Sequence, residues 1–225
     1  MQKHSGKILG QSEKFQVIDC KQCEFTHITP IPTFEELESF YTHKTNFVAK
    51  NLSFKKALSK LKREQTYWKM IFSDRIHKAK FFSNYKLKKP FRILDIGSQL
   101  GLFLQTAKEL NCDILGIEPS QIPYHYLRSL DLPVLNAPYE KVSLSEIGTF
   151  DFIHLSYVIE HLPDPKHLFQ TAYTLLKPKG ILCIEAPNDF NILQKALVTH
   201  LNKKNYWIHV PVHVNYFHFE SLSKL

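Results

Sequence analysis

Apolar and polar residues along the second half of the chain form short blocks that predict strands and helices in alternation. Brief apolar runs rich in strand-forming residues predict five strands, at Arg92–Ile96, Ile114–Glu118, Pro133–Asn136, Phe150–Leu155 and Ile181–Glu185. Segments with helical spacing of apolar residues predict helices at Leu102–Leu110, Gln121–Leu130 and Pro165–Leu176. Alternating strands and helices indicate an α/β domain whose mostly parallel sheet carries helices on both faces.

The first half of the chain follows a different pattern. Apolar residues recur in steps of three, four and seven from Phe54 to Tyr85, which predicts one or two long amphipathic helices. A capping box at Thr33 and Glu36 predicts a short helix, and two extended pieces are expected between Phe15 and Thr29. We therefore expect a small N-terminal attachment at residues 1–45, a helical linker at 46–89 and the α/β domain at 90–225.

The stretch that follows the first strand of this domain carries the strongest functional signal. The strand ends at Asp95, and Gly97 and Gly101 then frame a tight turn that leads into a helix. The motif lacks the G-K-[ST] of a P-loop and the spacing of G-x-G-x-x-G. A second acid, Glu118, stands 23 positions after Asp95 at the end of the next strand, where a ribose diol is held in nucleotide-binding sheets. The pattern predicts a nucleotide-binding loop.

Four segments in order, DIGSQLGLFL, GIEPS, FDFIHLSYVIEHLPDP and LLKPKGILCIEAPN, resemble the motifs of class I S-adenosylmethionine-dependent methyltransferases. The similarity is greatest to the bacterial small-molecule branch with an N-terminal CxxC segment. The resemblance implies a Rossmann-like, doubly wound sheet of strand order 3-2-1-4-5, with S-adenosylmethionine as cofactor. In one departure, Gln99 stands where the family usually has a third glycine, so its side chain is expected near the methionine end of the cofactor.

The resemblance also implies which residues bind the cofactor. Asp95 would act on the cationic methionine end, Glu118 would accept from both ribose hydroxyls, and the residues after the third strand would contact the adenine. The expected cofactor-binding residues are Asp95, Gly97, Ser98, Gly101, Glu118, Pro119, Ala137, Tyr139, Leu155 and Ser156.

A hydroxyl acceptor needs a proton acceptor near neutrality, for which histidine is suited. Two candidate catalytic residues follow, His213 and His161. If the segment around His213 is extended, its histidines share one side and its valines the other. Sugar C-methyltransferases that resemble this chain have Glu where Val212 stands, which counts against that chemistry. The expected acceptor is a small molecule with a hydroxyl, such as a sugar, a glycan precursor or a related metabolite.

The distribution of charge adds a second functional hypothesis for one segment. The net charge is +8, yet Lys50 to Arg92 alone contains 14 Lys and Arg residues against two acids. Such a segment is either a solvated helix face or a surface for an anionic partner such as nucleic acid. RNA methylation through the basic helix is therefore an alternative function.

The four cysteines do not suggest a disulfide framework. Cys20 and Cys23 form a single CxxC, and a structural zinc site needs four ligands. With no second CxxC, we expect a turn without metal, although His4 and His27 are further potential ligands. Cys112 and Cys183 fall in or beside core strands. No apolar run is long enough to span a membrane and no signal peptide is visible, so a cytoplasmic protein is expected.

The C-terminal part is shorter than the resembling fold, which adds two more strands after the fifth. We therefore expect a five-stranded core whose last edge is covered by Trp207–Phe217 or by a second copy in a homodimer. A second alternative follows from this and from Gln99, namely a degenerate, non-catalytic methyltransferase fold that serves as an interaction module.

Overall fold

The computed structural model describes residues 4–12, 14–39, 54–84, 90–203 and 205–225. It divides into two compact units. The terminal unit comprises Met1–Glu38, Tyr157–Phe169 and Glu185–Leu225, and the central unit comprises Ser39–Ser156 and Gln170–Ile184. This grouping is not the linear division expected at residues 45 and 89, because a strand near the C-terminus pairs with a strand near the N-terminus.

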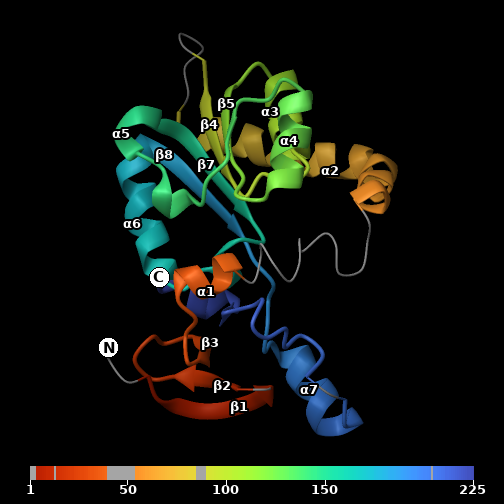
Figure 1. The fold of residues 1–225 in the computed structure, drawn as a ribbon, viewed down its shortest axis with the longest axis vertical. Helices are drawn as coiled ribbons and strands as arrows, with labels where there is room; N and C mark the ends of the chain where they lie inside the picture. The colour runs from red at the N-terminus through yellow and green to blue at the C-terminus, as the bar shows by residue number, and fades with distance from the viewer. Residues whose placement is uncertain (1–3, 13, 40–53, 85–89, 204) are drawn as a thin grey trace. The chain divides into compact units, whose positions relative to one another are not determined.

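The central unit is built on a five-stranded sheet (Figure 1). Its strands are β4 (Arg92–Ile96), β5 (Asp113–Ile117), β6 (Val134–Leu135), β7 (Phe150–Ser156) and β8 (Leu176–Glu185). The strand order is β6-β5-β4-β7-β8, which confirms the predicted order 3-2-1-4-5 and the Rossmann-like α/β fold. Strand β4 pairs in parallel with both β5 and β7, and β5 pairs in parallel with β6.

Helices cover the strands on both sides in Figure 1, which explains why the central strands are apolar along their whole length. In that view α3 (Leu102–Glu109) and α4 (Gln121–Ser129) lie on one side, and α5 (Leu144–Ile147) and α6 (Pro165–Leu175) on the other. Asp164 accepts a hydrogen bond from the His167 amide at the start of α6, as its capping position predicts.

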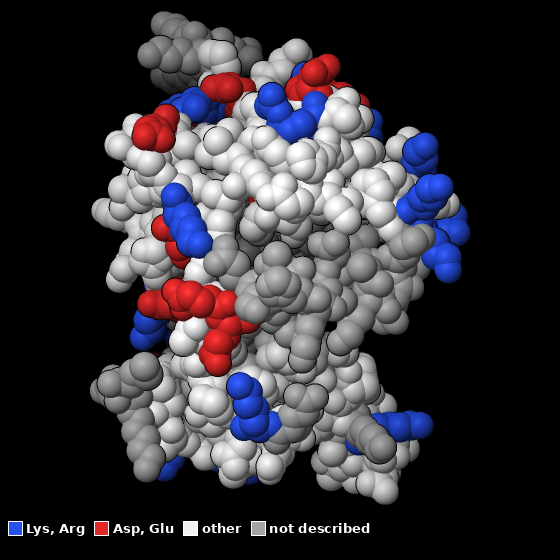
Figure 2. All heavy atoms as spheres, viewed as in Figure 1, with Lys and Arg blue, Asp and Glu red and all other residues white. Residues whose placement is uncertain are grey.

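The predicted amphipathic segment is one helix, α2 (Phe54–Phe82). Ile76 and Ala79 are buried in the core of the central unit, and Phe72 packs against the same core. Figure 2 shows Lys and Arg side chains over α2, and the exposed basic residues of its first half are Lys55, Lys56, Lys60, Lys62 and Arg63. Lys50 and residues 85–89 of the basic segment lie outside the described part of the chain.

The terminal unit contains a second, antiparallel sheet of order β1-β2-β3-β9. Its strands are β1 (Gly6–Ser12), β2 (Phe15–Cys20), β3 (Thr26–Thr29) and β9 (Asn215–Tyr216). Helices α1 (Phe34–Ser39), α7 (Ile192–Leu201) and α8 (Phe219–Ser223) belong to the same unit, except that Ser39 falls just outside it. Thr33 and Glu36 exchange backbone-to-side-chain hydrogen bonds of 2.8 and 3.2 Å, so the predicted capping box begins α1.

The segment before β9 differs from the expectation of an extended strand with histidines on one side. The His213 amide donates to the His209 carbonyl over 2.8 Å, so the chain turns there. Val214 and Asn215 are both buried, and strand structure is limited to Asn215–Tyr216. Those two residues pair with His27 and Thr26 of β3, so this part of the segment completes the second sheet instead of extending the first.

Candidate active site

A glycine loop leaves the carboxyl end of β4 and is tied to the neighbouring strand. The amides of Gly97 and Ser98 both donate to the carbonyl of Ile117, over 2.8 and 3.1 Å. Gly101 has φ of 72°, and a Cβ atom there would lie 2.2 Å from the Leu127 side chain. Only glycine therefore fits the point where the loop enters α3.

Glu118 closes this loop from the end of β5. Its buried carboxylate accepts from the Gln99 amide and from the Ser120 amide, each over 2.8 Å. Burial raises the pKa of Glu118, the two backbone donors oppose this shift, and the nearby Asp95 adds to it. A carboxylate has about four acceptor positions, so two further hydroxyl groups can still be accommodated.

Gln99 lies in this loop with φ of 46°, in the left-handed region, and it is exposed. Its backbone amide, not its side chain, is the group that Glu118 holds. The family's usual glycine would adopt this conformation without strain, which gives a backbone reason for glycine at this position.

Asp95 is held by residues that sequence reasoning missed. Its Oδ1 lies 2.8 Å from Nδ1 of His154, in the adjacent strand β7. Arg75 of α2 lies 3.1 Å from Nε2 of the same ring, and a guanidinium can only donate. His154 therefore accepts at Nε2 and donates from Nδ1 to Asp95, while its ring stacks on Phe103 at 3.7 Å. His154 lies in the buried middle of β7, and its partners Asp95 and Arg75 are distant in sequence.

The other expected cofactor residues also lie at carboxyl ends of the central strands. Pro119 follows β5, Ala137 and Tyr139 follow β6, and Leu155 and Ser156 are the last residues of β7. Asn136 donates to the carbonyls of Glu118 and Pro119, so it joins the ends of β5 and β6. All ten expected residues thus belong to the central unit, at the edge where parallel sheets bind nucleotides.

The two candidate catalytic histidines belong to the terminal unit. Their ring centroids lie 5.1 Å apart, and Nδ1 of His161 donates to the Val212 carbonyl over 2.7 Å. Burial lowers the pKa of His161, and the hydrogen bond to Val212 opposes this shift. Burial, with His161 and His209 adding to it, lowers the pKa of His213 to about 3. His213 is therefore a neutral imidazole at pH 7.

Glu160, which sequence reasoning did not single out, lies beside these rings. Its Oε1 is 3.8 Å from Nε2 of His161. Burial raises the pKa of Glu160 to about 8, and the carboxylates of Asp189 and Glu185 contribute. One ligand atom from each of Glu160, His161 and His213 lies within 4.8 Å of the other two, so the three side chains form one compact cluster.

Several buried polar atoms around this cluster have no hydrogen-bond partner among the described residues. They are both carboxyl oxygens of Glu160, Oδ2 of Asp189, Nε1 of Trp207 and Nδ1 of His213. Buried polar groups without partners are costly, so a polar ligand or an ordered water that satisfied them would stabilise the terminal unit.

Comparisons with known proteins agree with the fold. Residues 63–225 match the family described as methyltransferase domain. The ubiquinone biosynthesis O-methyltransferase of Colwellia psychrerythraea is 28% identical over 117 residues, which cover 49% of this chain and 45% of that protein. The chain therefore spans less than half the length of this curated relative.

Two solved structures share the fold at low sequence identity. The plantazolicin methyltransferase BpumL, in complex with SAH, has a TM-score of 0.52 at 17% identity and covers 84% of this chain and 71% of its own. DesVI of Streptomyces venezuelae has a TM-score of 0.51 at 18% identity, over 60% of this chain and 58% of its own. Of the helices in the described ranges, none combines the length and apolar character needed to cross a membrane.

Proposed function

The chain belongs to the methyltransferase domain family, and on that premise we propose that it binds S-adenosylmethionine and methylates a small molecule. The observation that carries this proposal is the buried carboxylate of Glu118, which holds the Gln99 amide of the glycine loop at the end of the adjacent strand. That arrangement brings an acceptor for a ribose diol next to a loop suited to a nucleoside.

Each part of the loop has a role in this proposal. Glu118 would accept from the two ribose hydroxyls, and Ala137 and Tyr139 would line the adenine side. Asp95, oriented by the donor His154, would face the positive methionine end, directly or through water. The cofactor would supply a methyl carbon that its sulfonium already activates, so the protein mainly has to align the acceptor.

The proposed acceptor is a hydroxyl on a sugar, a glycan precursor or a related metabolite. Its oxygen would form the new bond to the methyl carbon as the carbon–sulfur bond breaks, and its proton would pass to a base. The proposed base is His213, whose buried Nδ1 has no hydrogen-bond partner among the described residues. Its lowered pKa makes it a weak base, so it would relay the proton onward instead of retaining it. The unpartnered oxygens of Glu160 and Asp189 would bind further polar groups of the acceptor.

Cofactor binding is tested by isothermal titration of the full chain with S-adenosylmethionine and with S-adenosylhomocysteine. We expect heat of binding and a higher unfolding midpoint, because a ligand that binds only the folded state stabilises it. Glu118→Gln should weaken binding about tenfold or more, because a charged acceptor for two hydroxyls is lost. Glu146→Gln, an exposed acid in α5, is the matched control. Neither heat nor stabilisation at millimolar cofactor would contradict the proposal.

Acceptor chemistry is tested by incubating the protein with S-adenosylmethionine and a panel of sugar nucleotides, free sugars and phenols. Formation of S-adenosylhomocysteine with an O-methylated product, detected by mass spectrometry, is the expected outcome. Methylation of amines or carbon acceptors alone would exclude the hydroxyl assignment while leaving the methyltransferase assignment intact.

RNA methylation is the second candidate, supported by the exposed lysines along the first half of α2. It predicts RNA binding whose affinity falls steeply with salt, because each phosphate contact releases counterions. Replacing Lys55, Lys56 and Lys60 with Gln should then flatten that dependence. Absent or salt-independent RNA binding would remove this candidate.

A further inference from the structure

The N-terminal sheet brings together four side chains that are separate in the sequence. His4 precedes β1, Cys20 ends β2, Cys23 lies in the turn after it, and His27 is in β3. The pairing of Gly6 with Cys20 in the β1–β2 ladder brings His4 next to the turn. The turn itself is closed by hydrogen bonds from the Glu24 amide to the Cys20 carbonyl and from the Cys20 amide to the Phe25 carbonyl.

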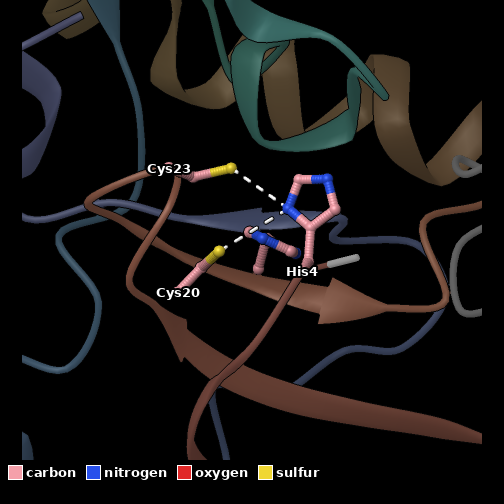
Figure 3. Close-up of side chains that lie close together, drawn as sticks. His4, Cys20 and Cys23 are labelled. Carbon is pink, nitrogen blue, oxygen red and sulfur yellow. Dashed lines mark hydrogen bonds between the residues drawn. The ribbon is translucent and has the colours of Figure 1, made fainter. Parts of the chain in front are cut away.

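The donor atoms of these residues are at the spacing of a metal's coordination shell. Figure 3 shows the sulfurs of Cys20 and Cys23 directed at one ring nitrogen of His4, with Nδ1–Sγ distances of 3.5 and 3.3 Å. One atom from each of the four residues lies within 4.8 Å of every other. A tetrahedron with Zn–S bonds of about 2.3 Å and Zn–N bonds of about 2.0 Å has N–S edges of roughly 3.5 Å.

His27 supplies an independent observation that points to a ligand. Its Nδ1 lies 2.8 Å from the Ile28 carbonyl, which can only accept, so Nδ1 carries the proton. Nε2 is then a lone pair, and it is buried without a hydrogen-bond partner within the described chain. A second nitrogen bonded to a backbone carbonyl is the usual way in which a metal-binding histidine is oriented.

Two thiols and two imidazoles do not satisfy one another without a cation. Cys20 and His27 are buried. Both thiols contact the same nitrogen of His4, Nδ1, so neither of them donates a hydrogen bond to Nε2 of His27. A divalent cation would occupy the centre, take the lone pair of His27 and stabilise both thiolates.

We propose that His4, Cys20, Cys23 and His27 form a structural zinc site. Two sulfur and two nitrogen ligands in a tetrahedral arrangement favour Zn²⁺ over the oxygen-preferring Mg²⁺ and Ca²⁺. The four protein ligands leave no position for water or substrate, so the ion stabilises the fold and takes no part in methyl transfer. The proposal thus differs from the expectation of a turn without metal, because two histidines that are distant in sequence complete the half-site.

The site would also support the cluster of Glu160, His161 and His213 within the same unit. His27 pairs with Asn215 of β9, and the Asn215 side chain donates to the carbonyls of Ile159 and Leu162. Those two carbonyls flank Glu160 and His161, so the ion would stabilise a sheet that anchors this segment. The proposal stands on the four ligands alone and does not depend on the cofactor or the acceptor.

The first test is the metal content of the full chain, purified with a C-terminal tag that does not bind metal. Elemental analysis should find about one zinc per chain, and Cys23→Ser or His27→Gln should lower zinc affinity about a hundredfold in a competition with a chromogenic chelator. Cys112→Ser and Cys183→Ser, in the central unit, are the matched controls and should retain zinc. Retention of zinc by Cys23→Ser, or loss from the controls alone, would overturn the assignment.

Cobalt substitution of the wild type gives a readout of ligand type and geometry that needs no variant. Co²⁺ added to the metal-free wild type should produce the intense visible bands of a tetrahedral site and a thiolate charge-transfer band, and His4→Asn should weaken both. Weak octahedral absorption would overturn the proposal. A Cys20–Cys23 disulfide in freshly purified protein, seen by mass spectrometry together with the absence of zinc, would overturn it as well.

Discussion

Replacing Glu160 by Gln should abolish an alkaline loss of stability in the terminal unit. The buried carboxyl of Glu160 has a pKa raised from 4.5 to about 8, and its two oxygens have no hydrogen-bond partner in the described chain. Glutamine has nearly the same shape as the protonated carboxyl and never ionises. The two proteins should therefore be similar in stability near pH 5 and diverge as the pH rises.

The sign and size follow from proton linkage. Between pH 4.5 and about 8 the unfolded chain has released the Glu160 proton while the folded chain retains it, so the free energy of unfolding falls as the pH rises. A shift of this size corresponds to at most about 5 kcal/mol, reached above pH 8. His213, whose pKa is lowered from 6.5 to about 3, acts in the opposite direction and costs stability as the pH falls through that range.

The two tryptophans allow the terminal unit to be followed separately. Trp207 is buried in that unit and Trp68 lies in α2 of the central unit. In a Trp68→Phe background, urea unfolding monitored by Trp207 fluorescence between pH 5 and 9 gives the required profile. We expect the stability of the parent to decline by about 3 kcal/mol between pH 6 and pH 9 and that of Glu160→Gln to stay nearly flat over the same range.

An exposed acid of the same unit provides the control. Glu220→Gln in α8 changes the net charge equally and should leave the decline of the parent unchanged. Parallel profiles for the parent and Glu160→Gln would refute the reasoning, since they would show that Glu160 ionises normally in the folded chain.

Three further predictions concern the loop and the histidines. Gln99→Gly should raise the free energy of unfolding in urea titrations by about 1 kcal/mol, because Gln99 has a positive φ. The same change should strengthen cofactor binding. If calorimetry detects binding only in the variant, the natural chain is a degenerate fold. His154→Phe should cost about 1–3 kcal/mol of stability and weaken cofactor affinity, because Asp95 loses its buried donor; an unchanged urea midpoint would contradict this. His213→Ala should lower turnover in the methyl-transfer assay with little change in calorimetric cofactor affinity, and an equal loss in both would assign His213 to folding or to the cofactor site.

The central sheet was predictable because its signals are local. Apolar runs such as Phe91–Leu94 have to be buried on both faces, and Asp95 with the glycines that follow can only end such a strand in a tight turn. Strand order, the amphipathic helix and the position of Glu118 at the next strand's end followed from periodicity, right-handed crossovers and family resemblance. The same kind of local signal placed the capping box of Thr33 and Glu36, since it depends on two residues three positions apart.

The sites that depend on long-range pairing were decided only by the tertiary structure. Asp95 and His154 are 59 positions apart and meet because β4 and β7 are adjacent. His27 and Asn215 meet because β9 completes the N-terminal sheet. A strand of two residues is too short to show a periodicity, so this pairing could not be predicted from the sequence. The same packing buries Glu160 and His213 and so shifts their pKa values. Desolvation depends on neighbouring residues from distant parts of the chain, which local sequence patterns do not reveal. The local pattern of apolar and polar residues therefore determined the fold class, and contacts between residues distant in sequence determined the chemistry of the sites.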